Sequence, residues 1–214
     1  MARPATSPRP RPAARARRGI SRLEIGLAAG LALCLAAAVS YPFLAHPSRG
    51  GAAAPARIGG PFDLVDQTGR RVTDRDLRGK PSLIAFGFTT CPDVCPTTLT
   101  RMTNWLKALG PAGDRLNVVY VTVDPQRDTP GQLRAYLSAF DPRIQGLTGS
   151  APAIAQIARE YGVFSQKVPL AGGGYTMDHS LILYLMDAQG RFVRPLGFDQ
   201  PDAVALPALR RLVG

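Results

Sequence analysis

Two cysteines separated by three residues, Cys91 and Cys95, are the side chains of this sequence best suited to chemistry. They follow an apolar run at residues 83–86 that is typical of a buried strand, and Pro96 then opens a segment with helical periodicity. Backbone N–H groups at a helix start favour negative charge, and hence a thiolate over a thiol. Since a thiolate is both a nucleophile and a soft metal ligand, the pair predicts either thiol chemistry or metal binding.

A purely structural disulfide is a poor explanation of this pair. If residues 91–95 are nearly helical, the two Cα atoms lie about 6 Å apart, which a disulfide tolerates. The loop closed by such a bond is too short to stabilise the fold strongly. The third cysteine, Cys34, lies inside an apolar segment and behaves most simply as a small hydrophobic residue. We therefore expect a chemical role for Cys91 and Cys95.

The sequence has two histidines, of which His179 is the candidate ligand. It lies between a glycine-rich stretch, 172–174, and an apolar segment, 180–186, that predicts a strand. His46 lies in a segment rich in Pro and Gly and is expected to be a solvated linker residue.

Two thiolates and one imidazole suit a thiophilic transition metal, and both copper and zinc fit such a set. A structural zinc site usually has four protein ligands, and no fourth Cys or His follows residue 46. Three ligands therefore favour copper, above all Cu(I), with Cu(II) as the second state. Asp178 adjoins His179 and Asp124 follows a predicted strand, so either carboxylate is a candidate to orient a ligand. Capping and turn formation explain the neighbouring 128–130.

The elements that position these residues alternate between strand and helix. Expected strands and helices are a hairpin at 62–72, a helical turn at 74–78, strands at 81–88 and 116–123, helices at 96–109, 129–140 and 150–161, a loop at 164–174, a closing hairpin at 180–196 and a helix at 202–212. This order predicts an α/β fold whose central sheet is mixed, mostly parallel with an antiparallel edge from the closing hairpin, and flanked by helices, similar to thioredoxin-like folds. In those folds the loop before the closing hairpin lies beside the cysteine helix, which places His179 near Cys91 and Cys95.

The N-terminal part of the chain predicts a membrane tether. Residues 1–24 hold seven arginines and one glutamate and are expected to be a disordered cytoplasmic tail. The uncharged segment 25–45 has the length of a transmembrane helix, and a cleaved signal sequence is the alternative. Arginines before it place the rest of the chain outside, so 46–60 is a linker and 61–214 an exported domain at the bacterial inner membrane, on the periplasmic side.

Charge distribution argues against nucleic-acid binding. The net charge is +11, but more than half of it comes from the arginine-rich tail, which adjoins the apolar segment rather than a folded basic face. The high pI is therefore a property of the tail and not of the exported domain.

Three stretches together resemble the Sco/SenC family of membrane-anchored, thioredoxin-like proteins. They are Phe86–Pro96, which contains both cysteines, Val123–Pro130, and Asp178–Ser180, which contains the histidine. The resemblance covers about residue 61 to the end and implies that Cys91, Cys95 and His179 are copper ligands. It also implies a function in cytochrome c oxidase assembly, in which copper is delivered to the binuclear copper site of an oxidase subunit, or the cysteines of that site are reduced. Other copper chaperones or thiol reductants are then expected partners.

The sequence leaves open whether the chain is an enzyme. A thiol–disulfide oxidoreductase that acts on exported proteins is the alternative, with Cys91 and Cys95 as its redox pair. Two residues, not three, normally separate the cysteines of thioredoxin-type enzymes, so a single specific client fits better than a general role. A peroxidase is disfavoured because Pro92 stands three residues before Cys95, where peroxiredoxins carry a threonine.

Overall fold

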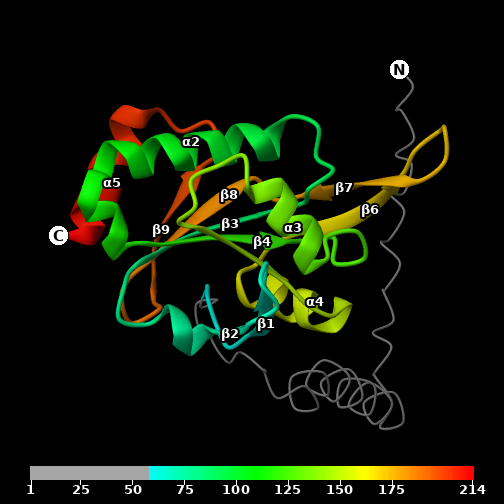
Figure 1. Ribbon diagram of the computed structural model, residues 1–214, viewed down its shortest axis with the longest axis horizontal. Helices are drawn as coiled ribbons and strands as arrows, with labels where there is room; N and C mark the ends of the chain where they lie inside the picture. The colour runs from blue at the N-terminus through cyan, green and yellow to red at the C-terminus, as the bar shows by residue number, and fades with distance from the viewer. Residues whose placement is uncertain (1–57) are drawn as a thin grey trace, which may run out of the picture. The chain divides into compact units, whose positions relative to one another are not determined.

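The computed structural model describes residues 58–214 (Figure 1). The segment predicted to span a membrane, 25–45, lies outside the described residues. Among residues 58–214, the structure contains no helix that is both long and apolar enough to cross a bilayer.

Strands and helices alternate along most of the described chain. The strands are β1 (Asp63–Asp66), β2 (Arg71–Thr73), β3 (Ser82–Gly87), β4 (Asn117–Thr122), β5 (Ile144–Thr148), β6 (Ser165–Pro169), β7 (Tyr175–His179), β8 (Ile182–Met186) and β9 (Phe192–Gly197). The α-helices are α2 (Val94–Leu109), α3 (Pro130–Leu137), α4 (Ala151–Glu160) and α5 (Asp202–Val213), with short 3-10 helices at Asp74–Leu77 and Gly110–Arg115.

Seven strands form one mixed sheet in the order β2-β1-β5-β4-β3-β8-β9, and β6 pairs with β7 in a separate two-stranded sheet. Strands β3, β4 and β5 are parallel, whereas β8 runs antiparallel to β3 and carries β9 at the edge. Ala85 of β3 lies opposite Tyr120 of β4 and Leu183 of β8. Of these central strands, β3 leads to the cysteines, and its neighbour β8 begins shortly after the histidine.

Helices cover both faces of this sheet. Successive residues of a strand point to opposite sides, so neighbouring residues of one strand pack against different helices. On one face, Phe86 of β3 packs its ring against Tyr161 at the end of α4. On the other face, Tyr120 of β4 packs against Tyr136 of α3, and α2 and α5 lie together above the sheet in Figure 1. Every residue of β3 is buried, as expected for a strand covered on both sides.

Three strands, β5, β6 and β7, were not expected from the sequence. Strand β5 was overlooked because Gln145 and Gly146 interrupt its apolar pattern, although Gly146 is required there: a Cβ would lie 2.5 Å from Leu137 Cδ1. The stretch expected to be a loop, 164–174, instead contains β6, and its glycines form the turn into β7. The positive φ angles of Gly173 (88°) and Gly174 (76°) suit a glycine turn.

The other expected elements are confirmed with small shifts. Helix α2 begins at Val94, two residues before the expected start, so Cys95 lies inside its first turn. Helix α3 ends at Leu137 rather than near Phe140. Thr129 caps α3 as expected, since its side chain accepts from the N–H of Gln132 at 3.2 Å.

Candidate metal centre

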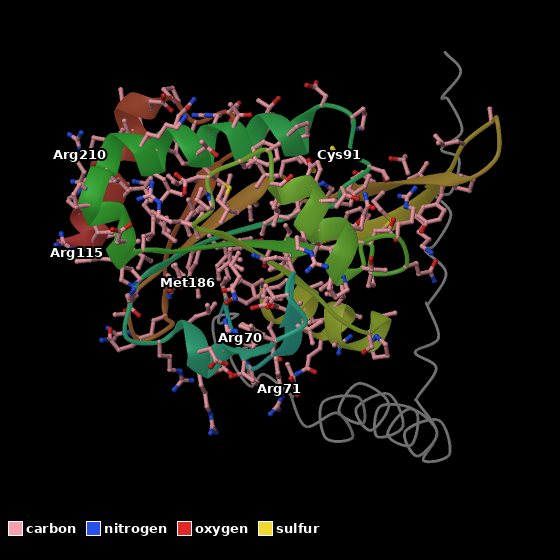
Figure 2. The ribbon with its side chains drawn as sticks, in the orientation of Figure 1. Arg70, Arg71, Cys91, Arg115, Met186 and Arg210 are labelled. Atoms are coloured by element: carbon pink, nitrogen blue, oxygen red, sulfur yellow. The ribbon has the colours of Figure 1, made fainter. Side chains whose placement is uncertain are left out.

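Both cysteines lie where β3 passes into α2. Cys91 occupies the connecting turn and is partly exposed, as labelled in Figure 2, whereas Cys95 in the first turn of α2 is 2% exposed. Both are free thiols. The Cys91 sulfur accepts the backbone N–H of Cys95 at 3.4 Å, while the N-cap residue Asp93 makes no capping hydrogen bond. Cys91 therefore performs part of the capping of α2, and this contact fixes the two cysteines relative to each other.

His179, the last residue of β7, brings an imidazole to the buried cysteine. Its Nε2 lies 3.7 Å from Cys95 Sγ across 84 residues of sequence. Its Nδ1 lies 3.0 Å from the carbonyl oxygen of Ser180. Because a carbonyl only accepts, Nδ1 carries the proton, and the lone pair of Nε2 is free on the side of the sulfur. This is the tautomer that a metal needs at Nε2.

Burial shifts the pKa of both groups toward their neutral forms. It lowers the pKa of His179, which is therefore neutral at pH 7. It raises the pKa of Cys95 to about 12, although the Phe88 backbone and the Tyr120 hydroxyl act in the opposite direction. The expectation that the helix start favours a thiolate is therefore wrong for Cys95, because desolvation is the larger effect. A metal ion would have to displace the proton of this thiol.

A small cavity lies beside these donors. Its volume is about 10 Å³, the size that one water molecule needs. Its lining includes Cys95, His179, Tyr120, Thr98 and Phe198. A much larger hollow of about 950 Å³, near Ile58 and Tyr161, contains neither cysteine nor the histidine.

The three predicted ligands approach one another but are not yet arranged around an ion. Within residues 58–214, no group of three or more Cys, His, Asp or Glu side chains converges closely enough to hold a metal ion. Cys95 contacts both other members of the set, His179 through its sulfur and Cys91 through its backbone. The two protein segments that carry the three side chains therefore meet at Cys95.

The two acidic residues expected to support the site have different positions. Asp178 is exposed and affects His179 only through its charge, while the Ser180 carbonyl is the group that orients the imidazole. Asp124 is buried and accepts hydrogen bonds from Arg127 and from the hydroxyl of Tyr175 at 2.9 Å. Asp124 therefore holds the start of β7, the strand that ends in His179.

Sequence reasoning missed Asp128, which it explained by capping. Asp128 is fully buried and accepts the N–H of Thr89 at 3.0 Å and the hydroxyls of Thr89 and Thr122, each at 2.6 Å. This carboxylate ties the turn that carries Cys91 to the end of β4. The available signal was its place at the carboxyl edge of a parallel strand, where sites of α/β folds form.

Arg127 was also missed, and it connects the hairpin to the same loop. Its guanidinium donates to Asp124 and to the backbone oxygen of Tyr175, the latter at 2.9 Å. It also stacks 4.0 Å from the centre of the Tyr175 ring and 5.9 Å from that of Phe88. One side chain thus contacts both the strand end before the cysteines and the strand that carries His179.

Comparison with known proteins gives one consistent family. The SCO1/SenC family model matches residues 50–214. Among curated proteins, the chain is 38% identical over 203 residues to "Protein SCO1, mitochondrial" of Saccharomyces cerevisiae. The aligned region covers 88% of this chain and 68% of the yeast protein. It is 41% identical over 145 residues to "Protein sco1" of Schizosaccharomyces pombe, with 66% of this chain and 55% of that protein covered. The chain thus spans about half the length of some of these relatives.

Solved structures agree with this family and with the fold. Bradyrhizobium japonicum ScoI with copper bound is 48% identical, with a TM-score of 0.69 over 72% of this chain and 99% of that one. Yeast Sco1 with copper bound is 39% identical, with a TM-score of 0.68 over 73% of this chain and 88% of that one. The thioredoxin-like α/β fold expected for the exported domain is confirmed.

Proposed function

Because this chain belongs to the SCO1/SenC family, we propose that it carries copper, held by Cys91, Cys95 and His179, for the assembly of cytochrome c oxidase. In this role it delivers the metal to the binuclear copper site of the oxidase or reduces the cysteines of that site. Copper is cargo here, not a resident cofactor. Two similar solved structures, those from Bradyrhizobium and yeast, have copper bound, and this supports the choice of metal.

The observation that carries the proposal is the contact between Cys95 Sγ and His179 Nε2 at 3.7 Å. A sulfur and an unprotonated imidazole nitrogen, both buried and beside an ion-sized cavity, are soft donors of the kind that copper prefers. Residues 58–214 contain no other Cys or His than these three, which suits Cu(I) at low coordination number better than a structural zinc.

The two cysteines have different tasks in this function. Cys95 is buried and loses its proton only when copper replaces it, so it retains the metal. Cys91 is partly exposed, so it is the sulfur that thiols of a client reach first. Transfer therefore begins by exchange at Cys91 and ends with release from Cys95 and His179. When the copper-free pair reduces a client disulfide, two electrons and two protons pass to the client, and the resulting Cys91–Cys95 disulfide cannot hold copper.

The location of the protein belongs to the same proposal. Residues 25–45 hold the chain in the inner membrane, and 61–214 face the periplasm, where the copper domain of the oxidase subunit also lies. Such tethering raises the effective concentration of the carrier near a membrane-embedded client.

Copper titration with matched variants tests the ligand set. The full chain is studied as a Cys34→Ala variant, so that the third cysteine does not contribute. One equivalent of Cu(I) is expected to bind tightly, and His179→Ala to weaken binding about 100-fold, the loss of one ligand. Asp178→Ala is the matched control, because its exposed carboxylate makes no hydrogen bond to the imidazole. Equal affinity in the wild type and His179→Ala would refute this ligand set.

A thiol–disulfide oxidoreductase is the second candidate, favoured by the hydrogen bond from the Cys95 N–H to Cys91 Sγ. This donor stabilises a thiolate at the more exposed cysteine, which would attack a client disulfide and release one client thiolate. Cys95 would then attack the mixed disulfide and release the second thiolate. Reduction of an oxidised copper-site peptide by the copper-free protein, abolished in Cys91→Ser, would support this activity; no exchange would exclude it.

A further inference from the structure

The hydroxyl of Tyr120 is buried and has no hydrogen-bond partner within the described part of the chain. Tyr120 lies in β4, in the centre of the sheet, and is 1% exposed. Leaving a polar group unpaired in such a place costs free energy, so an unpaired hydroxyl in a core needs an explanation. Phenylalanine would fill the same volume without that cost.

The unpaired hydroxyl lies beside the sulfur of Cys95. Gly87, at the end of β3, shows this most directly: a Cβ at Gly87 would lie 2.8 Å from Cys95 Sγ and closer still to the Tyr120 hydroxyl oxygen. The Cys95 sulfur and the Tyr120 hydroxyl therefore both border the space that a side chain at position 87 would occupy. Tyr120 and Cys95 also line the same small cavity together with His179.

We propose that Tyr120 is a positioning residue of the copper site, whose hydroxyl donates a hydrogen bond to the Cys95 sulfur once that sulfur is a metal-bound thiolate. This inference rests on the proposed function. A neutral thiol is a weak acceptor, so the phenol gains little in the copper-free protein. A thiolate is a strong acceptor, and the surrounding low dielectric strengthens the bond. The hydroxyl is thus a donor held ready for the loaded state.

Such a bond has two consequences. It stabilises the loaded state over the empty one, which raises copper affinity. It also draws electron density from the sulfur, as hydrogen bonds to cysteine ligands do in other copper sites, and so shifts the sulfur-to-Cu(II) charge-transfer band. The sulfur of Cys95 would then be held between two groups, His179 on one side and Tyr120 on the other.

Tyr120→Phe tests this inference, because it removes a single oxygen atom. The matched control is Tyr136→Phe. Tyr136 also has a buried hydroxyl without a partner among residues 58–214, and its ring centre is 6.2 Å from that of Tyr120, but it does not line the small cavity that Tyr120 shares with Cys95 and His179. The full chain carrying Cys34→Ala is used, with Cu(I) affinity measured by chelator competition and the charge-transfer band measured after Cu(II) loading.

We expect Tyr120→Phe to bind Cu(I) about tenfold more weakly, the effect of one hydrogen bond to a charged acceptor. Its charge-transfer band should move to longer wavelength. The copper-free variant should be as stable as the wild type or melt about 2–4 °C higher, because an unpaired buried hydroxyl is gone. A merely structural role would lower stability and leave the band unchanged. Tyr136→Phe is expected to leave affinity and band at wild-type values.

The outcomes separate this inference from the function on which it rests. A wild type that does not bind copper, or a His179→Ala variant that binds it equally well, overturns the proposed function and the inference with it. If the wild type binds copper through His179 but Tyr120→Phe keeps its affinity and band, only the inference is overturned. Equal changes in Tyr120→Phe and Tyr136→Phe also overturn it, since core polarity would then be the cause.

Discussion

Two regions of very different character supply the candidate ligands. The cysteine region, the turn between β3 and α2, is built into the central sheet and fixed by the fully buried Asp128. The histidine region, the hairpin β6–β7, forms a sheet of its own that projects past the central sheet in Figure 1. Every residue of β6 is exposed, and so are the large apolar side chains Phe164 and Leu170.

This difference indicates a site with one fixed and one adjustable part. The cysteine region keeps its geometry whether or not a metal is bound, because moving it would break buried hydrogen bonds. The hairpin is held beside its turn by contacts of Tyr175 with Arg127 and Asp124, and at its other end by hydrogen bonds between Phe164 and Ser180. Copper would join the two regions, and release of copper would free the hairpin again.

Hydrogen exchange should separate the two regions most strongly. Without copper, amides of β4 should exchange only through global unfolding, whereas amides of residues 167–178 should exchange at least about 1,000-fold faster, through local opening. Copper should slow exchange in the hairpin and leave β4 unchanged. The same experiment on His179→Ala is the control, in which copper should have no effect on the hairpin. Equal protection of the hairpin with and without copper would contradict an adjustable part.

Loss of the Asp128 carboxylate should damage the fixed region. Asp128→Ala leaves the Thr89 N–H and two buried hydroxyls without their acceptor, so we expect a loss of about 3–5 kcal/mol in the free energy of unfolding. Chemical denaturation of the copper-free protein measures it. Asp141→Ala provides a comparison, since that carboxylate pairs with Arg143 at some distance from the cysteines. If Asp128→Ala costs less than Asp141→Ala, Asp128 is not the anchor of the region.

Release of the turn end of the hairpin should weaken copper binding. Arg127→Gln removes the stacking on Tyr175 and the bond to its carbonyl, so His179 must be ordered at the moment of binding. We expect Cu(I) affinity to fall about tenfold and the free energy of unfolding to fall by up to about 3 kcal/mol, because the buried Asp124 carboxylate loses its cation. Lys167→Gln is the control, because this exposed cation also lies over the Tyr175 ring, at 4.3 Å, and donates to Gln126, but makes no bond to Asp124. Equal Cu(I) affinity in Arg127→Gln and the wild type would show that this contact does not position His179.

Acid should weaken the central sheet by a small amount. Burial raises the pKa of Asp66, the last residue of β1, but hydrogen bonds from Thr68, Arg70 and Gln145 together outweigh it and lower the pKa. A folded-state pKa below the unfolded value means that the contribution is complete above pH 4 and is lost as the pH falls further. Unfolding free energies at pH 5.5 and pH 3 should therefore differ less in Asp66→Asn than in the wild type. An unchanged difference would show that other carboxylates cause the acid sensitivity.

The sequence was informative wherever the signal was local. The spacing of Cys91 and Cys95, the apolar pattern of β3 and the cap at Thr129 each involve neighbours along the chain, and the structure confirms the elements that they predict. The approach of His179 to Cys95 was anticipated only through the topology of similar folds. It depends on the antiparallel pairing of β8 with β3, which no local pattern contains.

The missed residues share one property, which is that their partners lie on other elements. Asp128 reaches back to Thr89 across 39 residues, and Arg127 reaches forward to Tyr175 across 48. Tyr120 appeared to be one more apolar residue of a buried strand, because the gap at Gly87 that exposes its hydroxyl to Cys95 exists only in three dimensions. At Cys95 the helix start and burial act on the pKa of the thiol in opposite directions, and spacing does not show which effect is larger. Desolvation is larger and raises this pKa.

The separation of 84 residues between Cys95 and His179 has a consequence for biogenesis. In the proposed export from the N-terminus, both cysteines would reach an oxidising compartment well before the histidine emerges. During that interval the thiols would have no copper site and would be open to oxidation, since β8 has not yet paired with β3 and Cys95 is not yet buried. On the proposed function, metal loading would be the last step of maturation, and a reductant that meets the new chain would determine how much of the protein can be loaded.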